Sequence, residues 1–248
     1  MAHICALLVV GAAAAASPAP NELETLRRLE DEKRSVSGHP YWFPTSIVDS
    51  QAALRRPRSG DRAAAQEKAD LLLKLGRFDL AEKAYKELLA GGLDDRTRVE
   101  LWHGLAAAQF KQNGGEDLPS YRRARKTFKQ AAAAKLPAGE LRALSELGVC
   151  YSEWHVWLYG GQAPKGPVEA IAACGKALKI KTREETAAEV SEILAGVYLD
   201  SGAVELGRLY LDQAVSHLQA AARRGPSEAL SFDIARLKGR LANIKSLD

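Results

Sequence analysis

The stretch AEKAYKEL at residues 81–88 contains the pattern that decides how this chain folds. The pattern returns as ARKTFKQA at 124–131, AIAACGKA at 170–177 and AVSHLQAA at 214–221. Each copy has an alanine, a larger side chain four places later, and a small or apolar residue three places after that. The leading alanines are 43, 46 and 44 residues apart. Recurrence at such a period predicts an array of helical repeats, in which each unit buries its apolar face against its neighbours.

The composition agrees with close-packed helices. Apolar residues make up 46% of the 248-residue chain, and aromatic residues only 6%. Alanine and leucine, which are prominent here, favour helices, whereas strand-rich cores depend on β-branched and aromatic residues. The net charge of +4 permits an acidic partner without requiring one. The sequence therefore predicts an all-α fold.

Glycines and prolines divide most of the chain into paired helices. The predicted pairs are 62–75 with 78–89, 96–112 with 120–135, 139–159 with 167–180, and 183–200 with 204–224. A last amphipathic helix over 227–247 is expected to cap the open end of the stack. Before the pairs, we expect a polar helix over 21–35, an aromatic loop at 41–43 and a short helix over 45–56. The aromatic loop is either a recognition element or an apolar anchor for the N-terminal segment.

The paired helices resemble tetratricopeptide repeats (TPRs), whose usual period is about 34 residues. In that family the first helix carries Leu-Gly and then an aromatic residue, and the second carries alanine, an aromatic residue and alanine. The third unit matches best, with Leu147, Gly148 and Tyr151 in its first helix and Ala170 and Ala177 in its second. The resemblance covers residues 62–226. It implies an α-solenoid of about four TPR-like hairpins, with helices before it and a capping helix after it.

The longer period, about 44 residues, indicates a long-hairpin variant of the family. The additional residues fall between the two helices of units two to four, and seven residues make about two helical turns. The extended ends are expected to project as a ridge along one side of the array. Alanines at the helix crossings should let the helices approach, while the aromatic side chains fill the space toward the next hairpin.

The N-terminal residues predict export. The first twenty residues contain no Lys, Arg, Asp or Glu, and an apolar run from Ile4 to Ala16 precedes Ser17 and Pro18. This run is too short to span a membrane but suits the core of a secretory signal peptide, with small residues at its end. We expect a signal peptide over 1–16 and a periplasmic or extracellular product. The alternative is an alanine-rich leader without that role. No later segment predicts a transmembrane span.

The TPR resemblance implies a concave groove lined by the first helices. Family positions carried over one by one give the expected partner contacts as Gln66, Asp70, Arg98, Gln109, Arg142, Ser145, Glu189 and Glu192. Their mixture of arginine, amide and acid suits a peptide with polar and charged groups. The alternative is a solvated inner face. The Lys, Arg and Asn set with which some TPR proteins hold a C-terminal carboxylate is not found in this sequence.

A second candidate contact is the tip of the long hairpin in unit three. Its expected contact residues are Trp154, His155, Trp157 and Tyr159. Tryptophan is enriched at binding hot spots, so this tip could hold a partner. The alternative is an apolar stripe of Tyr151, Trp154 and Leu158 that packs the helix on its neighbour, and Trp154 fits this stripe better than Trp157 does.

Six cations lie on one predicted helix without an acid among them: Arg122, Arg123, Arg125, Lys126, Lys129 and Lys135. Nucleic acid is not expected as a partner, because Tyr121 and Phe128 belong to the core pattern and leave no stacking platform. We expect a solvated face, with attraction to an anionic polymer or lipid surface as the alternative.

Two cysteines fall on facing helices of unit three. In an exported chain, Cys150 and Cys174 could form a disulfide. Both also occupy core positions, where a free cysteine packs as a small apolar residue. Their spacing, with no paired histidines nearby, does not predict a zinc site.

The sequence contains no enzyme signature. The Gly-x-Ser-x-Gly and His-Glu-x-x-His motifs and the phosphate-binding loop do not occur, and His103, His155 and His217 are isolated. No cofactor or metal is expected. The sequence predicts an exported, non-catalytic scaffold that binds a protein or peptide in the cell envelope. The alternative is a helical envelope protein that binds a small apolar ligand. The predicted divisions are 1–16, 17–61, 62–226 and 227–248, and the oligomeric state stays open.

Overall fold

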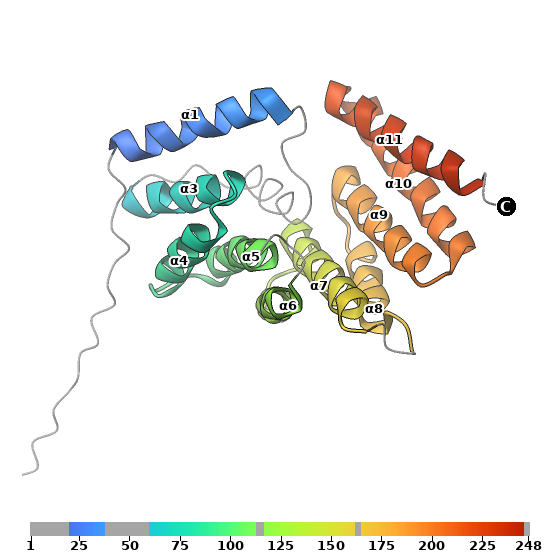
Figure 1. Ribbon diagram of the computed structural model, residues 1–248, viewed down its shortest axis with the longest axis horizontal. Helices are drawn as coiled ribbons and strands as arrows, with labels where there is room; N and C mark the ends of the chain where they lie inside the picture. Colours follow the sequence, from blue (N-terminus) through green and yellow to red (C-terminus); the bar gives the residue numbers. More distant parts are fainter. Residues whose placement is uncertain (1–19, 38–59, 113–116, 162–164, 246–248) are drawn as a thin grey trace, which may run out of the picture.

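The fold is a helical array built in chain order. The computed structural model describes residues 20–37, 60–112, 117–161 and 165–245. Within these ranges the chain forms ten α-helices and no strand, which confirms the predicted all-α class (Figure 1). The predicted signal peptide over 1–16, the aromatic loop at 41–43 and the helix over 45–56 lie outside the described residues.

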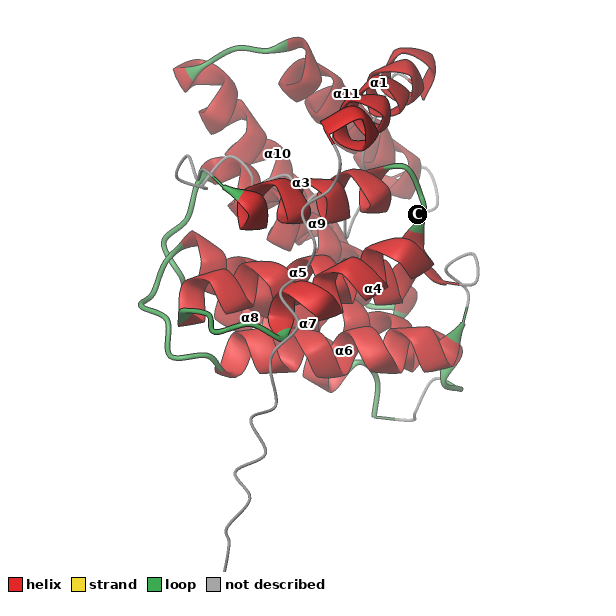
Figure 2. Ribbon diagram, turned by 90° about the vertical axis from the view of Figure 1, so that its left-hand side faces the viewer, coloured by secondary structure: helices red, strands yellow, loops and turns green. Residues whose placement is uncertain are grey.

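Eight of the helices form four hairpins, as the repeats predict. They are α3 (Asp61–Lys74) with α4 (Phe78–Leu89), α5 (Asp95–Lys111) with α6 (Leu118–Ala133), α7 (Glu140–Tyr159) with α8 (Val168–Leu178), and α9 (Glu184–Asp200) with α10 (Val204–Arg224). The predicted bounds of α4 and α10 match at both ends. The helix α1 (Pro20–Ser37) precedes the array, and α11 (Glu228–Lys245) follows it. The helix α1 lies against α3 and α11 lies against α10 (Figure 1), and Figure 2 shows the helical array from the side.

Short polar and glycine signals set where the helices begin and end. The carboxylate of Asp94 accepts a hydrogen bond from the backbone N–H of Thr97 at 2.8 Å, which caps the start of α5. Asp117 caps α6 in the same way through Ser120. After α3, Gly76 has a φ of 79°, a conformation that other residues rarely adopt, and this glycine starts the turn to α4.

The four alanines of the recurring pattern lie at the centre of the packing. Ala81, Ala124 and Ala214 are 0% exposed and Ala170 is 1% exposed. A methyl side chain at these positions lets the axes of the two helices of a hairpin come close together. The pattern therefore specifies packing, as the sequence predicts.

At each junction between hairpins, a large ring from one hairpin covers a glycine in the first helix of the next hairpin. The ring of Tyr85 lies over Gly104 and the ring of Phe128 over Gly148, both closer than any Cβ at those glycines would permit. These contacts confirm that the aromatic residues fill the space toward the following hairpin. In unit three Cys174 stands where the aromatic residue would be. There the covering ring comes from α7, because the indole of Trp154 lies 2.7 Å from the Cβ position of Gly196.

The two outer helices attach to the array differently. The helix α11 buries Leu237 and Leu241 against α9 and α10, so it covers the apolar end of the stack. The helix α1 is joined to α3 by the ion pairs Arg27–Glu67 at 2.6 Å and Lys68–Glu22 at 2.7 Å, which are largely exposed. Exposed ion pairs contribute at most about 1 kcal/mol each, and Leu26 of α1 also packs against the apolar core of the first hairpin. None of the described helices combines the length and apolar character that a membrane span requires.

Candidate interaction surfaces

Four of the eight residues expected in the groove are buried. Gln66, Asp70, Gln109 and Ser145 are between 0% and 7% exposed. Asp70 accepts a hydrogen bond from the Tyr85 hydroxyl at 2.6 Å, and Gln109 accepts one from Thr127 at 2.8 Å. In this structure these four side chains are therefore buried rather than open to a groove, and partner binding by them stays a prediction. Asp70, Gln109 and Ser145 form hydrogen bonds inside the array, whereas the side-chain nitrogen of Gln66 is buried without a partner among the described residues.

Ser145 forms its contact across two hairpins. Its Oγ lies 2.7 Å from Nε2 of His103, so α5 and α7 are joined by a buried hydrogen bond. Burial lowers the pKa of His103 to about 3, and the ring is neutral at physiological pH. His103 is fully buried, which makes it a packing residue with a polar contact rather than an accessible base.

The other four expected groove residues lie at or near the surface. Arg98 is half exposed and donates to Asp95 and to the carbonyl of Leu93, both at 3.0 Å, at the start of α5. Arg142 is exposed on α7, and Glu189 is half-buried on α9. Partner binding by these three stays a prediction.

The last of them, Glu192, is held by the C-terminal helix. It accepts from Nη1 and Nη2 of Arg236 at 2.6 and 2.8 Å and from Nη1 of Arg240 at 2.6 Å. The hydrogen bonds to Glu192 raise the pKa of Arg236. Glu192 therefore connects α9 to α11, a contact that repeat positions within units cannot predict.

At the end of the long hairpin in unit three, His155 lies inside a cluster of aromatic rings. Its ring centroid is 4.2 Å from that of Tyr151, 4.9 Å from that of Phe110 and 5.1 Å from that of Tyr121. Burial lowers the pKa of His155 to about 4, so it is neutral and packs as one more aromatic ring. These rings join α5, α6 and α7 at one end.

The neighbouring tip residues differ in what they present to solvent. Trp154 packs on Gly196, and its indole N–H donates to Asp200 at 3.0 Å. This is the packing alternative that the sequence leaves open for Trp154. Trp157 is half-buried, while Tyr159 is 47% exposed at the last position of α7. Of the four expected tip contacts, Tyr159 is the most open to a partner.

Lys111 is a notable residue that sequence reasoning missed. It is the last residue of α5 and is buried beside the aromatic cluster, with its ammonium 5.7 Å from the centre of the Phe110 ring. Burial lowers its pKa to about 7, so a substantial fraction of the amine is uncharged at neutral pH. A lysine at the end of an amphipathic helix usually extends into water, and the sequence therefore carries no signal of this burial.

The exposed apolar side chains of the array gather at one end of each hairpin. Among the described residues of α3 to α10, the large apolar side chains that are exposed all lie within six residues of the turn between the two helices of a hairpin. We call this set the tip edge: Leu80, Tyr159, Val168, Val204, Leu206 and Leu209. Successive hairpins stack in one orientation, so their turns follow a single edge of the array.

The tip edge is richest at the start of α10. Leu206 is 43% exposed and Leu209 is 50% exposed, three residues apart and therefore on one side of the helix. The sequence could have predicted the exposure of these two leucines. They do not fall on the face of α10 that carries the buried residues Leu211, Ala214 and Leu218.

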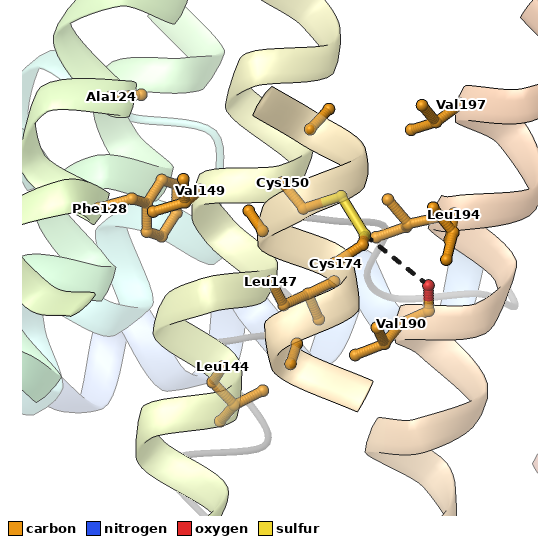
Figure 3. Close-up of a cluster of buried hydrophobic side chains, with 14 of the residues drawn as sticks. Ala124, Phe128, Leu144, Leu147, Val149, Cys150, Cys174, Val190, Leu194 and Val197 are labelled. Atoms are coloured by element: carbon orange, nitrogen blue, oxygen red, sulfur yellow. Dashed lines mark hydrogen bonds between the residues drawn. A yellow bond between two sulfur atoms is a disulfide. The ribbon is translucent and has the colours of Figure 1, made fainter. Parts of the chain in front are cut away.

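A disulfide closes unit three. Cys150 on α7 and Cys174 on α8 are bonded through their sulfurs, with their Cα atoms 5.2 Å apart. Figure 3 shows the bond inside the apolar core, with Leu147 and Leu194 around it. Both cysteines are 0% exposed. Of the two alternatives left open by the sequence, the structure has the bonded one.

Across the described ranges no three His, Cys, Asp or Glu side chains come together in a way that could hold a metal ion. His217 contacts Glu184 through Nδ1 at 2.6 Å on the surface, and this contact lowers the pKa of Glu184. The pair joins the start of α9 to α10.

Comparison with known proteins identifies the fold. No protein-family model and no curated protein matches the chain. Among solved structures, the chain is similar to nearly identical TPR-like repeats assigned to a kinesin light chain of Podosopora anserina. That match has 16% identity and a TM-score of 0.50 over 84% of this chain and 96% of the other. A single-substitution variant of the same protein matches at 17% identity and a TM-score of 0.51, over 83% and 96%. At this identity the likeness shows the fold alone, a TPR-like helical solenoid.

Proposed function

We propose that this TPR-like array is a non-catalytic scaffold that binds a partner protein along its tip edge. The observation that carries the proposal is the placement of the exposed apolar side chains. The interior is closely packed, yet large apolar groups such as Leu206 and Leu209 remain in solvent beside the hairpin turns. Apolar side chains that gather on one edge of a soluble protein are typical of interaction sites.

Binding at such an edge needs little ordering of the scaffold. The turns are supported by helices whose cores are buried, so the apolar groups are already in place before a partner arrives. A preformed surface loses less conformational entropy on binding than a flexible one. Tyr159 adds an aromatic side chain with a polar end, a residue type enriched at interface hot spots.

The substitutions Leu206→Ser and Leu209→Ser, made together, should abolish or strongly weaken partner capture without affecting folding. Both side chains are exposed, so their loss should change the free energy of unfolding by only about 0.5 kcal/mol. A photo-crosslinking residue placed at position 213, one turn beyond Leu209, would be used in the native host. We expect one dominant protein adduct that is lost in the double variant.

The matched control is Leu29→Ser on α1, which removes an exposed leucine outside the array. It should leave the adduct unchanged. Equal adduct yields from the wild type and the double variant would contradict binding at the tip edge.

The alternative of a small apolar ligand among the aromatic residues at 151–159 has less support. The ring of His155 occupies the middle of that cluster, within 5.1 Å of the rings of Tyr121, Tyr151 and Trp154. Native mass spectrometry of protein from its own host separates the two functions, because a bound small molecule adds a small fixed mass and a bound protein a large one.

We further propose that the protein is exported and acts in the cell envelope. The apolar run from Ile4 to Ala16 supports this proposal, and so does the disulfide of Cys150 and Cys174, because such bonds persist mainly in oxidising compartments. Sequencing the N-terminus of protein purified from the native host should give a start near Ser17. A product that retains Met1 would refute cleavage of a signal peptide over 1–16.

A further inference from the structure

The helix α6 carries a concentration of positive charge that the fold balances only in part. It contains five cations and no acid. Arg122, Arg123, Lys126 and Lys129 are exposed, and Arg125 is half-buried. We call these five residues the α6 cationic face. The helix lies in the outer row of the array, between α4 and α8 (Figure 1).

Only one carboxylate of the described residues balances this charge. Glu153 on α7 is 7% exposed and forms ion pairs with Arg125 at 3.1 Å and Lys129 at 2.5 Å. Arg123 donates to the neutral groups of Gln112 and Ser120, and no carboxylate of the described residues pairs with it.

Two cations remain outside these contacts. In the described part of the chain, no ion pair includes Arg122 or Lys126. The cationic face therefore has at least as many uncompensated charges as compensated ones.

This arrangement is unfavourable for the helix alone. Like charges three or four positions apart repel by about 0.2–0.5 kcal/mol per pair. Arg122 has Arg125 and Lys126 at those positions, and Lys126 also has Lys129.

On two other helices, cations are paired with acids at this spacing. Lys86 pairs with Glu82 on α4, and Arg96 pairs with Glu100 on α5, each four residues apart.

We infer that the α6 cationic face is an electrostatic docking surface for an acidic protein segment. Cations at positions 122, 126 and 129 rise along α6 by about 6 and 4.5 Å. Carboxylates on one side of an extended strand recur about every 7 Å, so an acidic segment lying along α6 can place a carboxylate near each cation. Such a segment would relieve the repulsion within the helix.

The surroundings of α6 favour a narrow partner over a flat membrane. The adjacent outer helices expose as many acids as cations, Asp79 and Glu87 with Lys83 and Lys86 on α4 and Glu169 with Lys176 on α8. A planar anionic surface would meet these acids together with the cations, whereas a single segment along α6 meets the cations alone. The described residues of α6 also expose no large apolar side chain that could insert among lipids.

The same surface lacks what single-stranded nucleic acid needs. Base stacking requires accessible aromatic rings, and the two aromatic residues of α6, Tyr121 and Phe128, are 0% exposed. An acidic polypeptide needs carboxylates alone for this contact. The inference concerns a surface separate from the tip edge and does not depend on the function proposed there.

The test measures binding of a fluorescent polyglutamate peptide to the full chain by anisotropy. At low salt we expect binding that weakens as the salt concentration rises, because exposed charges are screened. The double variant Arg122→Gln/Lys126→Gln should bind roughly tenfold more weakly, as expected from losing two exposed ion pairs. The matched control is Arg223→Gln/Lys238→Gln, which removes two exposed cations near the C-terminal end and should bind within about twofold of the wild type.

Three binding results would overturn the inference. One is no binding of polyglutamate at low salt, and another is equal weakening in both double variants. The third is binding of anionic phospholipid vesicles or single-stranded oligonucleotides that depends more strongly on Arg122 and Lys126 than polyglutamate binding does. A thermal midpoint for Arg122→Gln/Lys126→Gln that is unchanged or higher would support the inference, because the substitutions relieve repulsion. A lower midpoint would assign these cations to internal stabilisation and refute it.

Discussion

Replacing Gly148 by alanine should destabilise this protein by about 2 kcal/mol, although the same change usually stabilises a helix. Within a helix, alanine is favoured over glycine by about 0.5–1 kcal/mol. At position 148, however, the added Cβ would enter the ring of Phe128, which is 0% exposed and has no room to move aside. Overpacking of this kind typically costs about 1–3 kcal/mol and outweighs the gain in helix propensity.

The matched control is Gly175→Ala on α8. Gly175 is also inside a helix, but an added Cβ there would meet nothing within 4 Å. This variant should be as stable as the wild type or up to about 1 kcal/mol more stable. Urea unfolding followed by circular dichroism measures both variants. Stabilisation by Gly148→Ala would show that the ring of Phe128 does not lie on Gly148.

The contact between Phe128 and Gly148 also shows why so much of the fold could be predicted from the sequence. The fixed spacing of an alanine, an aromatic residue and a glycine indicates the local geometry. Each of these residues occurs where two helices approach each other or where a ring needs space. The first residues of α4 and α10 were predictable for the same reason, since Gly76 and Gly202 mark the turns before these helices. These signals act over a few residues and need no knowledge of distant contacts.

The candidate site was predictable only in part, because accessibility depends on distant residues. Repeat positions place Ser145 on the first helix of unit three, but His103, which bonds to it, is 42 residues away. Glu192 was expected to meet a partner, and it is held by Arg236, which is 44 residues away on the capping helix. A pattern within one unit contains no information about such contacts.

The tip edge was within reach of sequence reasoning. The extra length of the units directs attention to the hairpin ends, and Tyr159 lies there. Leu206 and Leu209 could have been recognised from their phase, since the buried face of α10 continues through Leu211 and Leu218. The burial of Lys111 could not have been predicted from the sequence, because only the surrounding rings explain it.

Reduction of the disulfide between Cys150 and Cys174 should lower the free energy of unfolding by about 3.5 kcal/mol. The bond closes a loop between residues 24 positions apart, and the loss of chain entropy in the unfolded state stabilises the folded one by about that amount. The effect should be centred on unit three, where Cys174 replaces the aromatic residue that Tyr85 and Phe128 supply in units one and two. Without the bond, two small side chains are left where the neighbouring units have a ring, so the packing there should not compensate for the lost cross-link.

The measurement is urea unfolding with and without a reducing agent, using Cys150→Ala/Cys174→Ala as the control. The double variant should be less stable than the oxidised wild type and insensitive to the reducing agent. Neighbouring units in a repeat array can unfold separately, so hydrogen exchange should show the loss of protection first in α7 and α8. Equal stability of the wild type in oxidising and reducing conditions would mean that helix packing alone holds unit three together. Loss of protection in α3 and α4 before α7 and α8 would mean that the bond acts on the array as a whole.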